Sequence, residues 1–338
     1  MPGAAEDLTA LTTLRLPAKA AARRDVTDLP ALREALADAR AAGLPVIVLG
    51  EGSNVVFAGD VDALVLRYTA TGREVIAEDD ASVTLRVAAG EHWHTLVCWC
   101  LEQGYHGLEN LALIPGTVGA APIQNIGAYG VELAPFVEAV HAVRIADGET
   151  LTLSRAECAF AYRDSIFKGA LRDAVVITAV DFRLPRAHVP VTDYPSLREA
   201  LAGQAAPPEP RDVFDAVVAL RRARLPDPAT TPNAGSFFKN PVVDAATAEA
   251  LARRYPGMPQ FAAPGGRKLA AGWLIEQCGW RGAEGEGVAV HPGHALVLVS
   301  RGGDGRALLA LAQRIQDSVA ETFGCRLEIE PRVYGAAA

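Results

Sequence analysis

One loop of the sequence gathers several polar groups around two aromatic residues. It reads Asn233-Ala-Gly-Ser-Phe-Phe-Lys-Asn-Pro241 and contains the hydroxyl of Ser236 and the ammonium group of Lys239. Gly235 permits a strained backbone before the serine and a close approach of substrate. No histidine lies near Ser236 in sequence, and a lone serine in a loop is usually solvated and inert. The loop therefore argues against a hydrolase with a serine nucleophile.

Two charged residues each have a functional and an ordinary interpretation. Residues 325–330 alternate between apolar and charged side chains, which predicts a strand with one solvated face. At the end of such a strand Glu330 is more often a surface charge than a catalytic group. Arg163 lies in a Tyr-Arg-Asp-Ser stretch, where it is either functional or an ion-pair partner of Asp164 or Asp181. The spacing leaves both alternatives open for each residue.

A glycine-rich turn, Gly50-Glu-Gly-Ser-Asn54, separates the apolar runs 45–49 and 55–57. It is not a dinucleotide-binding fingerprint, because the third glycine is missing and a strand rather than a helix is expected to follow. Its backbone N–H groups and the Ser53 hydroxyl can still form a nest for a pyrophosphate. A simple hairpin turn explains the pattern equally well.

The stretch 110–130 is apolar, rich in small residues, and interrupted by four glycines and two prolines. Such a composition suits neither a regular helix nor a regular strand. We expect its backbone to turn repeatedly while staying largely buried, as happens where a flat ligand lies against main chain.

The composition excludes several classes of protein. The length of 338 residues predicts two or three domains, and 50% hydrophobic with 21% charged residues is typical of a folded globular protein. A net charge of −8 argues against nucleic-acid binding, whereas a local cationic pocket can still hold a phosphorylated small molecule. Neither a signal peptide nor an apolar run of membrane-spanning length is recognisable, so we expect no membrane insertion.

Histidines and cysteines do not indicate a metal site. His92, His94, His291 and His294 have spacings unlike the usual zinc-binding patterns, so we expect no metal. The five cysteines are an odd number without a CxxC pair, which is typical of reduced, mostly buried thiols in a cytosolic protein.

Hydrophobic periodicity and end signals predict the regular elements. We expect helices at 28–43, 92–104, 268–278 and 304–323, and strands at 45–49, 55–57, 139–145, 175–184, 295–300 and 325–330. The Ala/Pro-rich stretch 205–210 is the best linker candidate, and a second α/β unit follows it.

Taken together, these stretches resemble one family, the UDP-N-acetylenolpyruvoylglucosamine reductases. The matching stretches appear in family order over nearly the whole chain, and the ordered set is very specific although each stretch alone is weak. They are Leu49-Gly-Glu-Gly-Ser-Asn-Val-Val-Phe57, Gly107-Leu-Glu-Asn-Leu-Ala-Leu-Ile-Pro-Gly116, Pro122-Ile-Gln-Asn-Ile-Gly-Ala-Tyr-Gly130, Tyr162-Arg-Asp-Ser-Ile-Phe-Lys168, Leu225-Pro-Asp-Pro228, residues 233–241, Lys268-Leu-Ala-Ala-Gly-Trp-Leu-Ile275, His291 with Ala295-Leu-Val-Leu298, and Glu330-Pro331.

The resemblance implies an α+β fold with a vanillyl-alcohol-oxidase (PCMH)-type FAD-binding domain in two subdomains and a C-terminal α/β substrate-binding domain. We place the two FAD-binding subdomains at 1–70 and 71–208 and the substrate-binding domain at 209–338. The longer members of the family carry an extra loop with a substrate-binding tyrosine. Residues 191–197 lie where that loop belongs, which gives this role to Tyr194, although Tyr-Pro-Ser replaces the usual Tyr-Gly-Asp.

The implied activity is reduction of UDP-N-acetylglucosamine enolpyruvate to UDP-N-acetylmuramate, a cytoplasmic step of peptidoglycan precursor synthesis in bacterial cell-wall formation. The enzyme would be a monomer that holds FAD without a covalent bond and takes its electrons from NADPH. It would bind neither nucleic acid nor a metal ion.

The resemblance also assigns roles to individual residues. The catalytic residues would be Arg163, Ser236 and Glu330. The residues that bind FAD would be Gly50, Gly52, Ser53, Asn54, Ile114, Pro115, Gly116, Ile123, Ile126, Gly127, Ala128 and Arg221. The residues that bind substrate would be Tyr162, Tyr194, Arg224, Lys239 and Asn240. Arg224 stands where the family usually has lysine, which keeps a positive charge for a diphosphate but changes the donor geometry.

In the chemistry that the resemblance implies, hydride from reduced flavin adds to the β-carbon of an enol ether conjugated to a carboxylate. Arg163 and a protonated Glu330 would stabilise the charge that develops on the carboxylate. Ser236 would deliver a proton to the α-carbon, helped by Lys239 or a water relay. An oxidase of the same flavin fold and a non-catalytic flavin- or nucleotide-binding module are the alternatives. Such oxidases often attach FAD to a histidine, and neither glycine-containing stretch (50–54 or 110–130) contains one.

Overall fold

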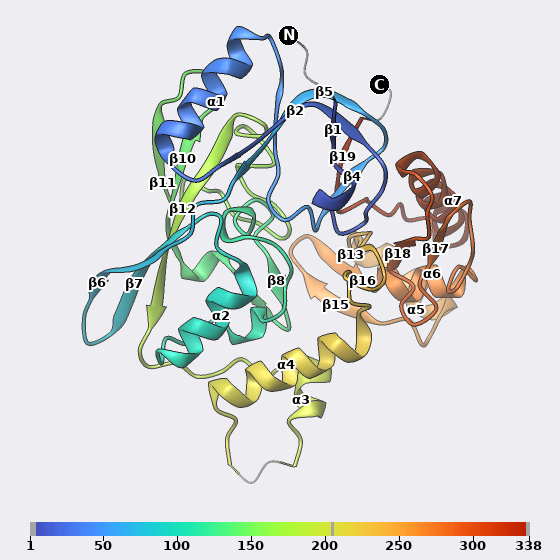
Figure 1. Cartoon of the computed structure of the whole chain (residues 1–338). Coiled ribbons are helices and arrows are strands. Elements are labelled where there is room, and N and C mark those ends of the chain that lie inside the picture. Colours follow the sequence, from blue (N-terminus) through green and yellow to red (C-terminus); the bar gives the residue numbers. More distant parts are fainter. Residues whose placement is uncertain (1–4, 204–205, 336–338) are drawn as a thin grey trace. The chain divides into compact units, whose positions relative to one another are not determined.

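The computed structural model describes residues 5–203 and 206–335. Their contacts divide them into two compact units, whose elements are labelled in Figure 1. Unit 1 contains residues 21–51 and 62–223, and unit 2 contains residues 5–20, 52–61 and 224–335. The predicted domain boundaries at residues 70 and 208 stay a prediction.

Unit 1 is built around a five-stranded antiparallel sheet with the strand order β11-β10-β12-β7-β6. Its strands are β6 (Arg73–Glu78), β7 (Ser82–Ala88), β10 (Val137–Arg144), β11 (Thr150–Ser154) and β12 (Val175–Pro185). Successive side chains of a strand face opposite sides, so Val83, Leu85 and Val87 enter the core whereas Arg86 between them is exposed. The hairpin β6–β7 extends away from the rest of unit 1 (Figure 1).

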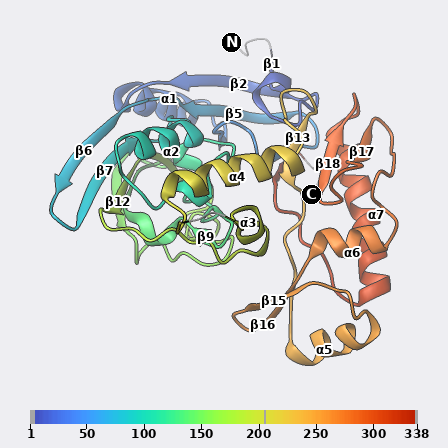
Figure 2. The same cartoon turned by 90° about the horizontal axis from the view of Figure 1, so that it is seen from below.

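Helices α2 (Trp93–Glu102) and α4 (Pro210–Arg224) pack into the same core as this sheet. Their apolar residues recur at intervals of three and four, which places them on one face of each helix. The His94 ring of α2 stacks on Phe214 of α4, with ring centroids 5.7 Å apart. Figure 2 shows these two helices next to each other, as Figure 1 does. Helix α4 begins at Pro210, the last residue of the predicted linker, whereas residue 205 of that linker lies outside the described residues.

A second sheet has the order β1-β2-β5-β3, formed by β1 (Glu6–Asp7), β2 (Lys19–Val26), β5 (Val61–Tyr68) and β3 (Val46–Val48). Helix α1 (Leu29–Ala41) packs on it through Leu32 and Leu36. The Asp28 carboxylate accepts a hydrogen bond from the Ala31 N–H at 2.8 Å at the start of α1, and Gly43, with φ +67°, follows its end. A capping aspartate before a helix and a glycine after it are features that sequence alone can indicate.

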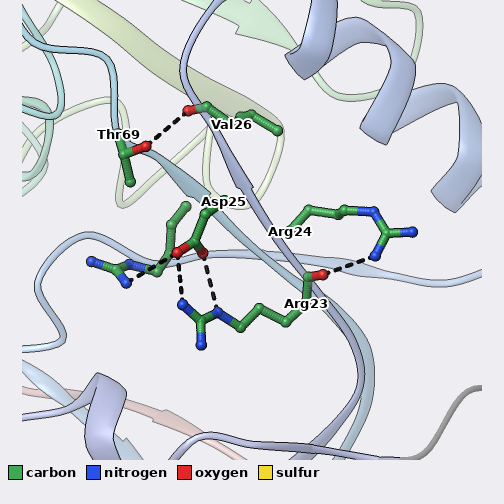
Figure 3. A network of polar contacts seen from close by, with 6 residues as sticks. Arg23, Arg24, Asp25, Val26 and Thr69 are labelled. Atoms are coloured by element: carbon green, nitrogen blue, oxygen red, sulfur yellow. Dashed lines mark hydrogen bonds and ion pairs between the residues drawn. The ribbon is translucent and has the colours of Figure 1, made fainter.

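Polar contacts at the end of β2 join it to β5 and to the residue that follows β5 (Figure 3). The Thr69 hydroxyl donates to the carbonyl of Val26 at 3.3 Å. The Asp25 carboxylate accepts from Arg23 at 2.6 Å and lies 3.4 Å from the guanidinium of Arg67. These contacts hold the chain in place immediately before it enters α1.

Unit 2 contains a three-stranded antiparallel sheet, β13-β18-β17, and a smaller sheet, β14-β16-β15. A parallel pair joins β4, which follows the glycine-rich turn, to the C-terminal strand β19. The strands are β4 (Val55–Phe57), β13 (Asn233–Ser236), β14 (Val242–Val243), β15 (Gln260–Ala263), β16 (Gly266–Leu269), β17 (Val288–Val290), β18 (Val297–Ser300) and β19 (Arg332–Tyr334).

Three helices belong to unit 2: α5 (Ala245–Arg254), α6 (Ala271–Gln277) and α7 (Gly305–Phe323). Helix α7 is capped by Asp304, which accepts from the Ala307 N–H at 2.8 Å, and it ends at Gly324 with φ +68°. Only one face of α7 is apolar and enters the core of unit 2. No helix within residues 5–203 and 206–335 is both long and apolar enough to cross a membrane.

Short elements complete the described chain. They are the 3₁₀ turns η1 (Thr9–Leu11), η2 (Glu109–Leu111), η3 (Val118–Ala120) and η4 (Ala134–Phe136), the strands β8 (Gly127–Ala128) and β9 (Val131–Glu132), and helix α3 (Pro195–Ala200).

Three expectations about local structure are wrong. The apolar runs on either side of the glycine-rich turn do not form a hairpin, because β3 pairs with β5 and β4 pairs with β19. The predicted helix 268–278 begins only at Ala271, since the residues before it belong to β16. Residues 325–330 alternate in burial as predicted, but they form only an isolated bridge, at Ile329, and the C-terminal strand comes later.

A buried aspartate on β12 has partners on both neighbouring strands. The Asp181 side chain accepts from two guanidinium nitrogens of Arg86, each at 2.8 Å, and lies 2.8 Å from Nε2 of His141. The alternative that pairs Arg163 with Asp181 is therefore wrong. Burial raises the pKa of Asp181, but the hydrogen bonds with Arg86 and His141 outweigh burial and lower the pKa to about 2.

We expect Asp181→Asn to lower the free energy of unfolding by about 2 kcal/mol at neutral pH, because one pKa unit is worth about 1.4 kcal/mol. A carboxyl group with a depressed pKa contributes stability above its unfolded-state pKa, near 4, and loses it as the pH falls through about 2. Urea unfolding of both proteins at several pH values should show the difference shrinking over that interval. A difference independent of pH would contradict this account.

Candidate functional site

The backbone of residues 110–130 reverses direction several times, as the sequence predicted. Leu113, Gly116, Asn125 and Tyr129 have φ values of +57°, +119°, +44° and +47°. Three of them are not glycine, so their left-handed conformations are strained unless surrounding contacts fix them. Most of the stretch is buried or half-buried, whereas Ile123 is 39% exposed despite its apolar side chain.

Side chains from α2 and from the glycine-rich turn hold the first part of this stretch. The Leu113 N–H donates to Nδ1 of His94 at 3.1 Å, and the Gly116 N–H donates to the Glu51 carboxylate at 2.5 Å. A Cβ at Gly50 would lie 2.9 Å from the Thr117 hydroxyl oxygen, so a larger residue there would require Thr117 to move. The turn at residue 50 and the stretch at 113–117 are therefore fitted to each other.

Glu51 has a second partner in His92, whose Nε2 lies 3.4 Å from the carboxylate. The hydrogen bond with His92 is the main reason why the pKa of Glu51 is lowered, and the same contact raises the pKa of His92. Nδ1 of His92 also accepts from the Thr95 N–H at 3.4 Å, at the start of α2. A ring protonated on Nε2 satisfies both contacts.

The loop that contains Arg163 is fixed by hydrogen bonds to main-chain carbonyls. Arg163 has φ +53°, and its Nη2 donates to the carbonyl of Gly127 at 2.7 Å. Lys168 donates through Nζ to the Arg163 carbonyl at 2.9 Å, and the Ser165 hydroxyl donates to the carbonyl of Ile123 at 2.6 Å. A Cβ at Gly127 would lie 3.2 Å from Nη1 of Arg163, so this glycine makes room for the guanidinium.

A second arginine lies near the same segment. Nε of Arg221, on α4, donates to the carbonyl of Leu113 at 3.1 Å. Burial lowers the pKa of Arg221, and the positive charge of Arg163 lowers it further, whereas Tyr129 acts in the opposite direction. The guanidinium groups of Arg163 and Arg221 are thus close enough to interact electrostatically. Together they offer the positively charged hydrogen-bond donors that an anionic ligand requires.

The two tyrosines assigned to substrate binding lie in unit 1. The guanidinium of Arg163 lies over the Tyr162 ring, 5.7 Å from its centroid. Tyr194 is 40% exposed, and its ring meets Tyr129 edge-on with centroids 5.3 Å apart. Both assigned side chains are therefore exposed enough to meet a ligand.

The second half of the glycine-rich turn belongs to unit 2. Gly52 has φ +67°, and a Cβ there would lie only 2.1 Å from the carbonyl oxygen of Leu11. The Gly52 carbonyl accepts from the Thr13 N–H at 3.2 Å, and the Asn54 carbonyl accepts from the Arg332 N–H at 2.9 Å. Ser53 lies between these two anchored residues.

Ser236 and Glu330 come together in unit 2. The Glu330 N–H donates to the carbonyl of Phe237 at 2.9 Å, next to an isolated bridge between Phe238 and Ile329. Both Ser236 and Glu330 are half-buried, whereas Phe237 and Phe238 are fully buried in the core of unit 2.

Gly235, before the serine, has φ +68°, and a Cβ there would meet nothing within 4 Å. The open space beside it is compatible with the predicted close approach of substrate. The Gly235 N–H donates to the buried side chain of Asn233 at 2.8 Å, which fixes the turn into Ser236.

The remaining assigned residues of unit 2 have structural contacts as well. Nζ of Lys239 lies 2.8 Å from the Glu328 carboxylate. The Asn240 side-chain oxygen accepts from the Ala271 N–H at 2.9 Å, at the start of α6. Arg224 lies close enough to His294 to lower the pKa of that imidazole, after burial and His291.

The four histidines considered as metal ligands do not form a common site. His291 and His294 each accept a hydrogen bond from a nearby backbone N–H in their own turn, and His92 and His94 hold main chain as described above. Among residues 5–203 and 206–335, no three side chains of His, Cys, Asp or Glu gather closely enough to hold a metal ion.

The residues present fit a bound flavin nucleotide. Exposed Ile123 offers an apolar surface, and Arg163 and Arg221 supply positive charge beside the carbonyls of Gly127 and Leu113. These residues lie in unit 1, on or next to the main chain of 110–130. An apolar surface suits a flat ring system, and positive charge suits its phosphate groups.

Sequence reasoning missed the side chains that fix this main chain. Glu51, His94, Asn110 and Lys168 each bond a backbone group of the assigned segments. Glu51, Asn110 and Lys168 lie inside the stretches that resemble the family, which is the only signal that could have identified them.

Two family models match the chain. Residues 21–154 match an FAD binding domain, and residues 227–334 match the C-terminal domain of UDP-N-acetylenolpyruvoylglucosamine reductase. The UDP-N-acetylenolpyruvoylglucosamine reductase of Burkholderia ambifaria is 54% identical over 299 residues, which cover 87% of this chain and 86% of that protein. The one from Burkholderia multivorans is 51% identical over 330 residues, which cover 96% of this chain and 94% of that protein.

A solved structure is similar along the whole chain. The crystal structure of UDP-N-acetylenolpyruvylglucosamine reductase (MurB) from Thermus caldophilus has a TM-score of 0.66 at 25% identity and covers 98% of each chain. Together with the two matched domains, this similarity confirms the predicted fold class, a PCMH-type FAD-binding domain followed by a C-terminal domain of mixed helices and strands.

Gly52 and Gly43 form a matched pair for testing the glycine-rich turn, since both have φ +67°. Gly43→Ala should cost about 1–2 kcal/mol, the usual penalty for a left-handed residue with a Cβ. Gly52→Ala should cost more than about 4 kcal/mol, because its Cβ would collide with the Leu11 carbonyl. Urea unfolding measures both costs, and the flavin content of the purified variants should fall only for Gly52→Ala. Equal costs would show that the turn can move away from Leu11.

Proposed function

The chain belongs to the family of UDP-N-acetylenolpyruvoylglucosamine reductases, and from this premise we propose how its own residues carry out the reaction. It is an FAD-dependent oxidoreductase that uses NADPH to reduce UDP-N-acetylglucosamine enolpyruvate to UDP-N-acetylmuramate in peptidoglycan precursor synthesis. The observation that carries this conclusion is the match of both halves of one chain, the flavin-binding half and the half specific to the reductase.

When bound, FAD would supply the hydride chemistry that the reduction of the enol ether requires, with NADPH as the source of electrons. We propose that the flavin is held without a covalent bond, by the glycine-rich turn, the main chain of 114–128 and Arg221. The support is the fit of Gly50 against Thr117 and the anchoring of Gly116 and Leu113 by side chains of the same unit.

Arg163 is proposed as the group that holds the substrate carboxylate. A guanidinium presents a planar set of donors that matches a carboxylate, and it stays charged at every physiological pH. The Gly127 carbonyl orients this guanidinium in advance, and Lys168 holds the backbone behind it. A positive charge fixed in place before reaction is what lowers the energy of an enolate that forms during it.

Ser236 is proposed as the proton donor to the α-carbon, with protonated Glu330 as a hydrogen-bond donor to the substrate carboxylate. The backbone bond between Glu330 and Phe237 supports a shared role, because it keeps the two residues at neighbouring positions. A serine hydroxyl is a weak acid, so it can act only on a strongly basic carbanion such as the one the reaction generates. Lys239 lies on the same segment as Ser236, and its ammonium group pairs with the Glu328 carboxylate.

The remaining assigned residues would bind the substrate: Tyr162, Tyr194, Arg224, Lys239 and Asn240. Tyr194 and Arg224 would hold its UDP diphosphate, with Arg224 supplying positive charge. The exposure of the Tyr194 ring supports its role, and residues 191–197 would be the tyrosine loop of the longer family members. The protein would act in the cytoplasm as a monomer, with subdomains at 1–70 and 71–208 and a substrate-binding domain at 209–338.

Steady oxidation of NADPH by the purified protein should require UDP-N-acetylglucosamine enolpyruvate and yield UDP-N-acetylmuramate. The loss of NADPH absorbance and the mass of the product measure this directly. Acid precipitation should release intact flavin into the supernatant, because FAD is not covalently bound. NADPH oxidation that depends on oxygen but not on the enolpyruvyl substrate would point instead to an oxidase or to a non-catalytic flavoprotein.

Ser236→Ala should separate proton transfer from flavin binding. The variant should keep FAD, and NADPH should reduce it at nearly the parent rate. Reoxidation by the enolpyruvyl substrate should slow by at least about 10³-fold, a barrier increase of about 4 kcal/mol. Loss of a hydroxyl that only forms a hydrogen bond costs about 0.5–1.5 kcal/mol, or roughly tenfold.

Stopped-flow traces of the two half-reactions measure the rates of flavin reduction and reoxidation separately, and they show whether Ser236 is the proton donor. Ser236→Cys restores a transferable proton and should recover part of the reoxidation rate. Reoxidation of Ser236→Ala within about tenfold of the parent would mean that another group is the acid.

A further inference from the structure

The segment that leads to Tyr194 lies between β12 and α3 and is neither helix nor strand. We call residues 186–194 the tyrosine loop segment. Val189 in its middle is 86% exposed, whereas Leu197 just beyond its end is fully buried in the core of unit 1. A segment without regular structure keeps a defined position only if side-chain contacts fix it.

The first such contact is buried. Nε2 of His188 lies 2.6 Å from one carboxylate oxygen of Glu109, and the other oxygen accepts from the Gly107 N–H at 2.7 Å. Glu109 is only 1% exposed, and the His188 side chain is largely covered. The contact thus joins the middle of the tyrosine loop segment to the start of the main-chain stretch assigned to the flavin.

The charge on Glu109 makes this contact hard to break. Burial raises the pKa of Glu109, but the hydrogen bonds from His188 and from backbone N–H groups outweigh burial and lower the pKa overall. The carboxyl group is therefore ionised at neutral pH while it is almost excluded from water. Releasing the loop would leave that buried negative charge with fewer partners, which is strongly unfavourable.

A second contact acts nearby. The Asn110 amide nitrogen donates to the carbonyls of Val191 at 2.8 Å and of Tyr129 at 3.0 Å. Tyr129 in turn meets the ring of Tyr194. Consecutive residues of one 3₁₀ turn, Glu109 and Asn110, therefore hold the loop at two points on the way to Tyr194.

We propose that His188 and Glu109 form a positioning pair that holds the tyrosine loop segment so that Tyr194 faces the nucleotide part of the substrate. This inference rests on the substrate-binding role proposed for Tyr194. The pair itself touches neither the substrate nor the flavin. Its effect is to raise the fraction of molecules whose Tyr194 is ready to bind.

The test compares His188→Ala with a matched control, His141→Ala. His141 makes an equivalent contact with a buried carboxylate, that of Asp181, but on strand β10. If the loop of His188→Ala is correctly placed in about one molecule in ten, the KM for the enolpyruvyl substrate should rise about tenfold. Flavin reduction by NADPH and kcat should stay within twofold of the parent, and His141→Ala should leave KM unchanged. His188→Gln retains an N–H donor and should recover part of the loss.

An unchanged KM in His188→Ala would overturn the proposal. An equal loss in both half-reactions would also overturn it, because it would place the damage at the flavin.

Hydrogen exchange distinguishes a failure of the positioning pair from a failure of the role assigned to Tyr194. Exchange of residues 186–194 should become faster in His188→Ala and not in His141→Ala, whatever Tyr194 does. If Tyr194→Phe leaves KM unchanged while exchange responds as expected, the role of Tyr194 falls and the holding contact stands. If exchange does not respond, the positioning pair is refuted.

Discussion

A buried main chain that is not helical or part of a ladder must find a separate hydrogen-bond partner for each of its N–H and C=O groups. Outside the short elements η2, η3 and β8, residues 110–130 are such a chain, and side chains of unit 1 supply several of the partners. The pairs are Glu51 with Gly116, His94 and Arg221 with Leu113, Ser165 with Ile123, Arg163 with Gly127, and Asn110 with Tyr129. The placement of α2, α4 and the loop at 162–168 follows from this requirement.

Because of this requirement, the arginines assigned to the site have a structural function as well as the function proposed in binding. Arg163 and Arg221 orient main-chain carbonyls, and a carbonyl is a dipole that fixes a guanidinium without cancelling its charge. Positive charge is thereby held next to a segment that is suited to a flat anionic ligand. Replacement of Arg163 therefore changes the main chain at Gly127 as well as the charge, so activity lost on its removal does not by itself identify a catalytic role.

The elements that could be predicted are those whose signals are local. Helices α1 and α7 have an aspartate cap, an apolar face and a glycine stop within a few residues of one another. The errors concern pairing, which depends on distant parts of the chain. The runs 45–49 and 55–57 are as close in sequence as a hairpin requires, yet they pair with β5 and β19 respectively. Alternation at 325–330 correctly gave the buried face but could not show that no neighbouring strand pairs along its length.

For the site, too, the sequence identified individual stretches but not the contacts between distant parts of the chain. The stretches around Ser236, Arg163 and Glu330 were identified by their resemblance to a family, because spacing alone gave each of them an ordinary explanation. What the sequence could not show is how Ser236 comes to lie near Glu330, since the contacts between their segments join distant parts of the chain: the isolated bridge of Phe238 with Ile329 and the ion pair of Lys239 with Glu328. Phe237 and Phe238 follow Ser236 directly and are fully buried in the core of unit 2. The apolar packing of that core therefore helps to set the position of the neighbouring polar groups.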